Sequence, residues 1–281
     1  MKRIFLFSIF VSGLLIQCGP PRAPILSAEQ IILRESVPTK LTVQPGNKKL
    51  YLKWNTNCPK GVVLSGYNIY ILREPLEQKF YDPNPPAKIK AFNSLPYPGD
   101  TESNGNYETM KIETLDNGIE YFITVRTVYP NGAVSAASNE VSAIGRPEGK
   151  FSLSFRYAGL NDGFCFAKGL SVRADADDND IYFFQKDGFD FAASPHRLNG
   201  FLRESSFYSL GKTRDIYQYP LFKIDIPPVE KIPILVGESY LVKMADGHYA
   251  KIRIEKATGQ DKERILEIRY IYQTVKNLIR F

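Results

Sequence analysis

The acidic run at residues 175–180 is the one stretch of this sequence whose residue types and spacing resemble a metal site. Asp175, Asp177 and Asn179 stand at alternate positions, as do the first three oxygen ligands of an EF-hand calcium loop. The sixth position of such a loop should be Gly and is Asp180, and the twelfth should be Glu and is Lys186, so the spacing excludes an EF-hand. Two interpretations stay open for these residues: a looser calcium site between strands, or a solvated turn.

Residues that could perform catalysis are scarce. His196 lies in a loop rich in Pro, Asn and Gly, and His248 lies at a predicted hairpin turn. No other His occurs in the sequence, so a Ser-His-Asp or Cys-His catalytic site is not indicated. The sequence contains no Gly-x-Ser-x-Gly elbow, no His-Glu-x-x-His and no phosphate-binding or dinucleotide-binding glycine pattern. We therefore expect a non-catalytic protein. A polysaccharide-processing enzyme stays open as an alternative, because a catalytic pair of carboxylates can come from anywhere in a chain.

Cys58 and Cys165 form an even pair once the third cysteine, Cys18, is set aside. In an oxidising compartment they could form one disulfide, or they could remain two separate thiols. Neither has a sequence neighbour that would lower the pKa of its thiol, so no catalytic thiol is indicated.

The N-terminus has the pattern of an export signal. Lys2 and Arg3 give a positive start, and residues 4–16 are mostly apolar, a run typical of a secretory signal and too short to span a bilayer comfortably. Residues 14–18 (LLIQC) resemble a bacterial lipobox. This resemblance implies that residues 1–17 are a signal peptide, that Cys18 carries diacylglycerol and palmitate, and that residues 18–36 tether the protein to a membrane of the cell envelope.

Two neighbours of Cys18 refine this expectation. Gln17 departs from the Gly, Ala or Ser that usually precedes the lipobox Cys, so an ordinary secretory signal or an uncleaved anchor stays open. Gly19 resembles the residue that follows the Cys in lipoproteins sent to an outer membrane. We therefore expect a lipid-anchored protein of the cell envelope, at the outer membrane.

Composition limits the partners of the mature chain. Of 36 basic side chains, Lys2 and Arg3 leave with the signal, so 34 face 30 acidic ones and the net charge is +4. This charge is small and evenly spread, which argues against nucleic acid. We expect the membrane as one partner, together with an unidentified protein, glycan or small molecule.

At 281 residues the chain is long enough for two domains, and its 17 Tyr and 18 Phe favour strands.

Residues 37–146 show the alternation of β-strands, and landmarks within them resemble a fibronectin type III domain. The landmarks are Trp54, Tyr67, Leu115, Tyr121 and the run Glu140-Val141-Ser142-Ala143. The resemblance implies an Ig-like sandwich with a tyrosine corner, in which the hydroxyl of Tyr121 bonds to backbone a few residues upstream. The fold class is therefore predicted to be all-β.

The proline-rich stretch at residues 75–106 is longer than a fibronectin loop should be. A loop of this length is often functional, and Tyr81, Phe92 and Tyr97 would offer it an aromatic contact surface. The alternative is a wandering edge strand with a mobile tip.

Residues 145–149 have the composition of an interdomain linker, and residues 150–281 are predicted to form a second antiparallel β domain. Its end is a three-stranded meander over residues 240–244, 250–254 and 266–272, with a hairpin turn at Asp246 and Gly247. Its irregular loop at residues 193–220 is a second candidate recognition surface.

This last meander resembles the end of HmuY-like surface lipoproteins, a haem-binding family. The resemblance implies haem held between two His, for which the domain offers only His196 and His248. Axial ligation needs both imidazoles on opposite faces of one ring, and nothing in the sequence enforces that arrangement. Two surface His residues without a cofactor are the alternative. The function predicted from the sequence is therefore non-catalytic binding, with haem or small-ligand capture as a second possibility.

Overall fold

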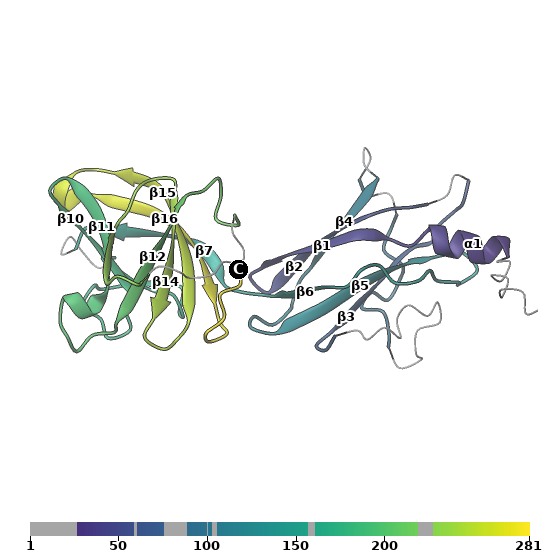
Figure 1. Cartoon of the computed structure of the whole chain (residues 1–281), viewed down its shortest axis with the longest axis horizontal. Coiled ribbons are helices and arrows are strands. Elements are labelled where there is room, and N and C mark those ends of the chain that lie inside the picture. Colours follow the sequence, from purple (N-terminus) through teal and green to yellow (C-terminus); the bar gives the residue numbers. More distant parts are fainter. Residues whose placement is uncertain are drawn as a thin grey trace, which may run out of the picture.

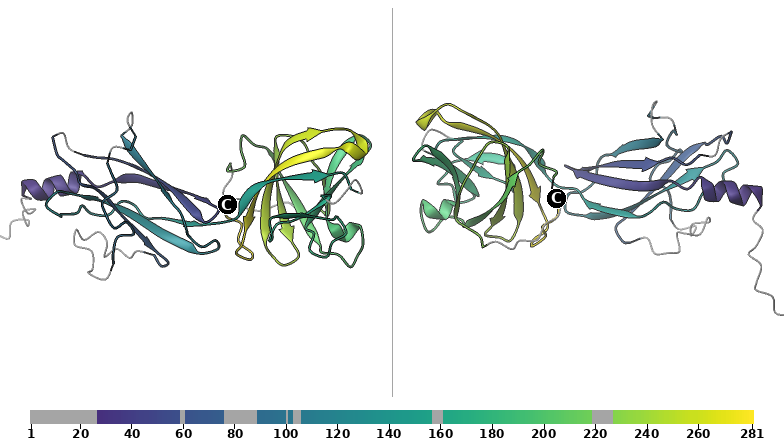
Figure 2. Two further views of the ribbon diagram at one scale, coloured as in Figure 1. Left: turned by 180° about the vertical axis from the view of Figure 1, so that it is seen from behind. Right: turned by 45° about the horizontal axis from the view of Figure 1, so that its top comes forward.

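The computed structural model describes residues 27–281, apart from residues 59–60, 76–88, 100, 103–105, 157–160 and 219–226. These residues form two all-β domains that follow one another along an elongated molecule (Figure 1). Helix α1 (Ala28–Glu35) lies at one extremity and the second domain at the other, while the C-terminus lies between the two domains (Figures 1 and 2).

The N-terminal domain is a sandwich of two antiparallel three-stranded sheets. One sheet has the order β1 (Thr39–Gly46), β2 (Lys49–Asn55), β4 (Tyr107–Ile112), and the other β3 (Gly66–Leu72), β5 (Glu120–Val128), β6 (Val141–Ile144). Alternate residues of β2, namely Leu50, Leu52 and Trp54, are buried because side chains on a strand alternate in direction. The predicted all-β sandwich is confirmed for this domain.

A tyrosine corner lies in the connection between β4 and β5. The backbone N–H of Asp116 donates a 3.1 Å hydrogen bond to the hydroxyl of Tyr121, as the fibronectin resemblance implies. This bond holds the turn before β5 against the strand, so the corner is fixed by a residue that also belongs to the core.

Helix α1 is part of the N-terminal domain. Ser27 and Gln30 form a capping box at its start, which satisfies two N–H groups of the first turn. At its end, the hydroxyl of Thr127 donates to the carbonyl oxygen of Ser36 at 2.6 Å, and Tyr129 bonds to the Ser36 side chain. The predicted tether at residues 18–36 is therefore too long, because residues 28–35 are helical and fastened to β5.

The C-terminal domain contains two five-stranded antiparallel sheets. The strands of the first, in order, are β13 (Lys231–Pro233), β11 (Phe189–Ala193), β10 (Ile181–Lys186), β8 (Gly163–Cys165) and β9 (Leu170–Val172). Those of the second are β12 (Ser205–Lys212), β14 (Glu238–Met244), β15 (Tyr249–Thr258), β16 (Ile265–Gln273) and β7 (Glu148–Ser154). Two 3-10 turns, η2 (Pro195–Arg197) and η3 (Asp261–Glu263), complete the domain. The predicted meander is confirmed as β14, β15 and β16.

The second sheet is buried on both faces. Tyr240, Val242 and Ala250 point into the main core, whereas Leu241 and Ile271 belong to a smaller cluster on the opposite face. That smaller cluster is covered by the segment after β12 and by the C-terminus of the chain, through Ile216, Tyr217, Ile279 and Phe281. The end of the chain is thus a structural part of the domain.

The joint between the domains is short and held from both sides. Strand β6 ends at residue 144 and β7 begins at residue 148, so the linker is residues 145–147, and residues 148–149 of the predicted linker belong to β7. Gly118 N–H donates to the carbonyl oxygen of Gly145 at 2.8 Å. From the C-terminal domain, Arg280 contacts Glu120 at 2.7 Å and the carbonyl oxygen of Ser142 at 2.5 Å.

The two cysteines of the described residues lie in different domains and are not bonded to each other. Cys58 is exposed in the N-terminal domain, and Cys165 is buried in β8. Burial raises the pKa of the Cys165 thiol. The disulfide considered from the sequence is therefore wrong, and two separate thiols are found instead.

Candidate functional site

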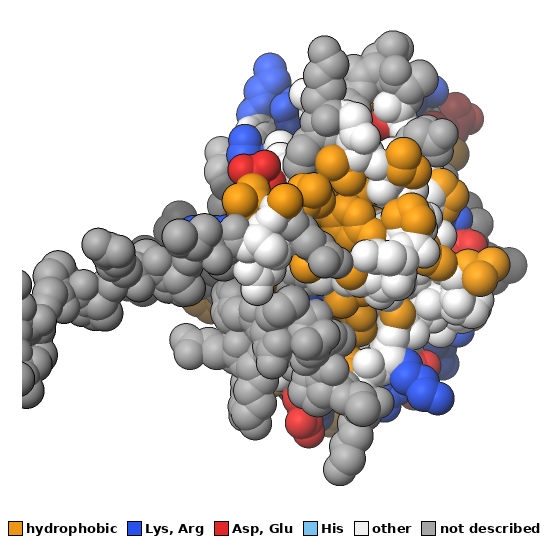
Figure 3. All heavy atoms as spheres, turned by 90° about the vertical axis from the view of Figure 1, so that its right-hand side faces the viewer, with side chains coloured by type: hydrophobic (Ala, Val, Ile, Leu, Met, Phe, Trp, Pro, Cys, Tyr) orange, Lys and Arg blue, Asp and Glu red, His pale blue; other side chains and the backbone are white. Residues whose placement is uncertain are grey.

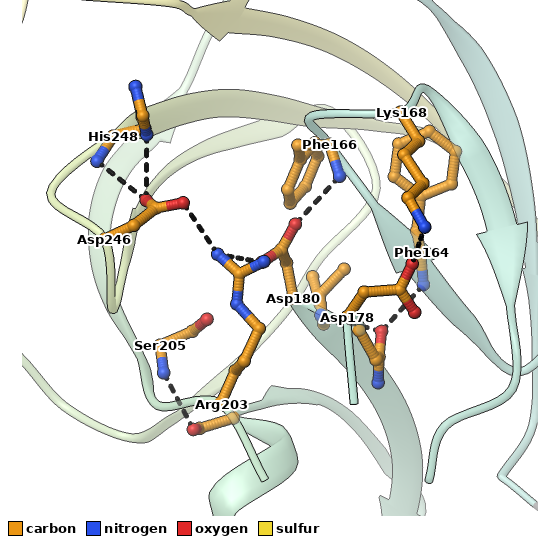
Figure 4. A network of polar contacts seen from close by, with 12 residues as sticks. Phe164, Phe166, Lys168, Asp178, Asp180, Arg203, Ser205, Asp246 and His248 are labelled. Carbon is orange, nitrogen blue, oxygen red and sulfur yellow. Dashed lines mark hydrogen bonds and ion pairs between the residues drawn. The ribbon is translucent and has the colours of Figure 1, made fainter. Parts of the chain in front are cut away.

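Arg203 connects three separate parts of the C-terminal domain (Figure 4). Arg203 precedes β12, Asp180 precedes β10, and Asp246 lies in the turn between β14 and β15. Nη2 of Arg203 lies 3.2 Å from Oδ1 of Asp180 and 2.9 Å from Oδ2 of Asp246. One guanidinium therefore ties the segment before β12 to two neighbouring segments.

Asp180 is the buried end of this network. Its side chain is 1% exposed and accepts a 2.8 Å hydrogen bond from the backbone N–H of Phe166. Burial raises the pKa of Asp180 to about 6, although the charge of Arg203 and the N–H of Phe166 both act to lower it. Removing one partner of such a buried pair costs about 3–5 kcal/mol, so Arg203 and Asp180 depend on each other.

Asp246 and His248 form the outer end. The backbone N–H of His248 donates to Oδ1 of Asp246 at 3.1 Å, and Nδ1 of its ring lies 2.9 Å from the same oxygen. Burial opposes ionisation of Asp246, but the hydrogen bonds from His248 and the charge of Arg203 outweigh it and hold the pKa of Asp246 below its usual value. The ring of His248 packs against Tyr272 with centroids 5.6 Å apart.

The acidic run at residues 175–180 does not assemble a calcium site. Asp175 pairs with Arg173 through two 2.8 Å contacts, Asp178 pairs with Lys168 at 2.7 Å, and Asp177 points to solvent as an exposed residue. Across the described residues, no group of three or more His, Cys, Asp or Glu side chains could hold a metal ion. Asp175 and Asp178 are turned toward separate cations and Asp177 toward solvent, so these residues form a solvated turn and not the looser calcium site that the sequence left open.

Asn179 has a structural role in the same run. Its side-chain oxygen accepts from the N–H of Phe164 at 2.9 Å, and its amide donates to the carbonyl oxygen of Ala174 at 2.8 Å. Asn179 is fully buried, so these bonds satisfy polar backbone groups that water cannot reach.

The two histidines approach Arg203 from different elements. His196 lies in η2, and its backbone N–H donates to the carbonyl oxygen of Arg203 at 3.1 Å. Nδ1 of His248 lies 2.9 Å from Oδ1 of Asp246, which is itself paired with Arg203. Both His residues are therefore linked to Arg203, His196 through its backbone and His248 through Asp246, a connection that the sequence did not reveal.

The loop at residues 195–204, which we call the Arg203 loop, exposes a large aromatic side chain. Phe201 is 97% exposed. The backbone beneath it is ordered, because the side-chain oxygen of Asn199 accepts from Phe201 N–H at 3.1 Å and the carbonyl oxygen of Asn199 accepts from Leu202 N–H at 2.9 Å. The sequence indicated the wider loop at residues 193–220 but did not single out Phe201, although an aromatic after Asn-Gly was a signal that could have found it.

The predicted contact aromatics of the N-terminal domain have different positions. Phe92 is 49% exposed, in agreement with a surface role, and Tyr81 lies outside the described residues. Tyr97 instead packs edge-on to Trp54, with centroids 6.0 Å apart, and its hydroxyl donates to the carbonyl oxygen of Thr109 at 2.7 Å. Tyr97 is therefore wrongly predicted as a contact residue, because it pairs with Tyr67 of β3 in an isolated β-bridge and packs against the core.

Comparisons with known proteins add little to this description. No protein-family model matches the chain, and no curated protein matches it. Among solved structures, it is similar to one described as a myokine structure, with 16% identity and a TM-score of 0.26 over 40% of this chain and 99% of that chain. It is also similar to the twitchin kinase region from C. elegans, with 11% identity and a TM-score of 0.27 over 85% of this chain and 39% of that chain. At these scores neither likeness carries an argument about activity.

Among the described residues, no helix has both the length and the apolar character that a transmembrane span needs.

Proposed function

We propose that the protein is a lipid-anchored, non-catalytic binding protein of the cell envelope, and that the Arg203 loop of its C-terminal domain contacts the ligand. The observation that carries this proposal is Phe201, whose ring is 97% exposed on a loop held by the ion pairs of Arg203. The lipobox resemblance at Cys18 supports the anchor, and Gly19 supports the outer membrane as its location.

A fixed loop is well suited to binding. Because the ion pairs of Arg203 already hold the loop in one conformation, binding a partner would cost little further conformational entropy. Covering an exposed aromatic ring of this size contributes roughly 3 kcal/mol of apolar burial. Aromatic residues that enter a partner's pocket often dominate the binding energy of an interface. Phe201 is therefore the residue whose loss should weaken binding most.

The chemistry of the loop favours a neutral ligand surface. Its two cations are already paired, Arg203 with Asp180 and Asp246 and Arg197 with Glu230. Apart from the exposed Glu204 at its end, the loop therefore presents mainly a ring and backbone amides. Such groups suit the apolar face of a sugar or an apolar side chain of another protein. The shape of the molecule fits this role, since anchoring at Cys18 would leave the C-terminal domain at the end remote from helix α1 (Figure 2).

Site-specific photo-crosslinking tests this proposal on intact cells. A benzophenone amino acid replaces Phe201 in one variant and Phe189, which is 59% exposed in the same domain, in a matched control. We expect position 201 to give a defined crosslinked species and position 189 to give none. Arg203→Gln, added to the first variant, should weaken the crosslink because the loop loses its ion pairs. Equal crosslinking from both positions, or none from position 201, would contradict the proposal.

Haem binding by His196 and His248 ranks behind this proposal. The ring of His248 is already engaged by Asp246 and packed on Tyr272, and these contacts do not prepare it as one of two opposed axial ligands.

A further inference from the structure

The end of the N-terminal domain that carries helix α1 is an apolar surface. Figure 3 looks onto this end and shows hydrophobic side chains gathered across it. Ile31 is 42% exposed and Val63 is 71% exposed. A shallow groove beside them is lined by Ile32, Leu33, Val62, Tyr129, Asn131 and Ala133. We call Ile31, Ile32, Leu33, Val62, Val63 and Ala133 the apolar base.

The apolar base is held rigidly. Helix α1 is capped by Ser27 and bound to β5 through Ser36, whose carbonyl oxygen accepts from Thr127 at 2.6 Å. Tyr129 donates from its hydroxyl to the carbonyl oxygen of Ile32 at 3.3 Å, directly beneath the groove. The helix therefore cannot easily turn its apolar side chains inward, and Ile31 and Val63 stay in contact with water unless another surface covers them.

Position in the chain indicates which surface covers them. Residues 19–26 separate Cys18 from Ser27, the N-cap residue of helix α1. A chain of this length spans at most about 30 Å, since each residue adds no more than about 3.6 Å. If Cys18 is anchored, the lipid surface is thus always within about 30 Å of the apolar base. A surface tethered so closely competes for the patch at a high effective concentration.

We propose that the apolar base rests in the interfacial layer of the membrane that holds the lipid on Cys18, so that the protein stands with its C-terminal domain outward. This inference rests on the proposed lipid anchor. Aliphatic side chains on a rigid helix end enter the boundary between headgroups and acyl chains, where they leave water without losing any hydrogen bond. The contact would fix an orientation that a flexible tether alone leaves free.

Fluorescence quenching in vesicles tests the orientation. The chain from Cys18 onward is coupled through the Cys18 thiol to a maleimide lipid in phosphatidylcholine and phosphatidylglycerol vesicles that contain brominated acyl chains. Cys58→Ser prevents coupling at the exposed Cys58, and its hydroxyl can keep the hydrogen bond that the thiol donates to the carbonyl oxygen of Val62. Cys165 is buried and does not compete. Because coupling is chemical, this test does not depend on natural acylation.

Two Trp reporters distinguish the ends of the molecule. Trp54, the single native Trp, is buried in the core and serves as background. We expect Val63→Trp to be strongly quenched and Phe189→Trp, on the other domain, to be no more quenched than Trp54. Adding Ile31→Glu should reduce the quenched fraction of Val63→Trp about tenfold. The matched change Ile265→Glu, at a residue 41% exposed in the C-terminal domain, should leave it unchanged.

Two results would overturn the inference. One is equal quenching of Val63→Trp and Phe189→Trp while flotation shows that the coupled chain stays on the vesicles. The other is that the uncoupled chain sediments as a dimer and that Val63→Glu converts it to a monomer. That result would assign the apolar base to contact with a second copy of the protein. Absence of lipid on the natural chain is a separate result: it would contradict the lipid anchor of the proposed function and remove the membrane on which this inference rests, whereas the quenching of the chemically coupled chain tests the orientation itself.

Discussion

At the scale of single residues, the candidate site depends on a carboxylate held ionised inside the C-terminal domain. Asp180 is almost fully buried, and Arg203 and the N–H of Phe166 are what allow it to carry charge there. The sequence placed Asp180 in an acidic run but could not show this environment. Its partner Arg203 comes from a distant segment, and its hydrogen-bond donor, the N–H of Phe166, lies just after strand β8.

The ionisation of Asp180 makes a defined contribution to stability against pH. The pKa of Asp180 is raised to about 6 in the folded protein by burial, above its usual value of 3.8. A raised acid pKa means that the folded state binds the proton more tightly. The stabilisation is therefore full below pH of about 3.8 and is lost as pH rises through about 6.

The change Asp180→Asn isolates this contribution. Between pH 5 and 7, we expect the free energy of unfolding of the wild type to fall by about 1 kcal/mol relative to Asp180→Asn, which has no proton to lose. Urea denaturation at several pH values, followed by circular dichroism, measures this difference. A pH dependence that is the same in both proteins would show that Asp180 is not buried in an ionisable form.

At the scale of elements, the close approach of the segment around Tyr97 to strand β3 depends on Gly66. Gly66 has φ +132°, and a Cβ added there would lie 2.1 Å from the carbonyl oxygen of Tyr97. No L side chain fits this gap. The β-bridge between Tyr67 and Tyr97, and with it the contact of Tyr97 with Trp54, therefore requires glycine at position 66.

We expect Gly66→Ala to displace the segment around Tyr97 and to destabilise the protein by about 2 kcal/mol or more. Gly132→Ala is the matched control, because Gly132 also has positive φ, +83°, but nothing lies within 4 Å of an added Cβ. Its cost should be limited to about 1–2 kcal/mol of backbone strain. Denaturation followed by Trp54 fluorescence reads both effects. Equal costs with an unchanged emission spectrum would contradict the role given to Gly66.

Elements with a long alternating pattern were predictable from the sequence, and very short ones were not. The turn at Asp246 and Gly247 was predicted because Gly accepts positive φ, and Gly247 has φ +86°. Strands β8, β9 and β13 have three residues each, too few for an alternation to be recognised. The β-bridge at Tyr97 agrees with the wandering edge strand that the sequence left open, although the prolines around it gave no bounds for such a pairing.

At the scale of the whole molecule, the linker has a composition that suggests flexibility, yet contacts of Arg280 join the two domains. We call these contacts the clasp. Arg280 extends from near the C-terminus to Glu120 and Ser142. Burial opposes ionisation of Glu120, but the hydrogen bonds from Ser142 and Arg280 outweigh it and lower the pKa of Glu120. No local pattern in the sequence predicts this clasp, because its two sides are far apart in the chain.

Arg280→Ala should loosen the joint without unfolding either domain. The side chain of Arg280 is 37% exposed, so its loss should cost less than about 1 kcal/mol. The amides of Gly118 and Arg146 form the hydrogen bonds that join the linker to the N-terminal domain. We expect these two amides to exchange hydrogen up to about fivefold faster in the variant. Arg269→Ala is the control, because Arg269 is equally exposed but pairs with Glu255 inside one domain. Identical exchange in the two variants would contradict the clasp.

In the function that we propose, the lipid at Cys18 would determine how the whole molecule is presented, with α1 toward the membrane and the Arg203 loop away from it. Mass spectrometry of the N-terminal peptide from membranes tests this directly. We expect a peptide that begins at Cys18 and carries a diacylglycerol thioether, and we expect the Cys18→Ser variant to lose both the lipid and the membrane fraction. A peptide that begins at Met1, or an unmodified Cys18, would contradict the account.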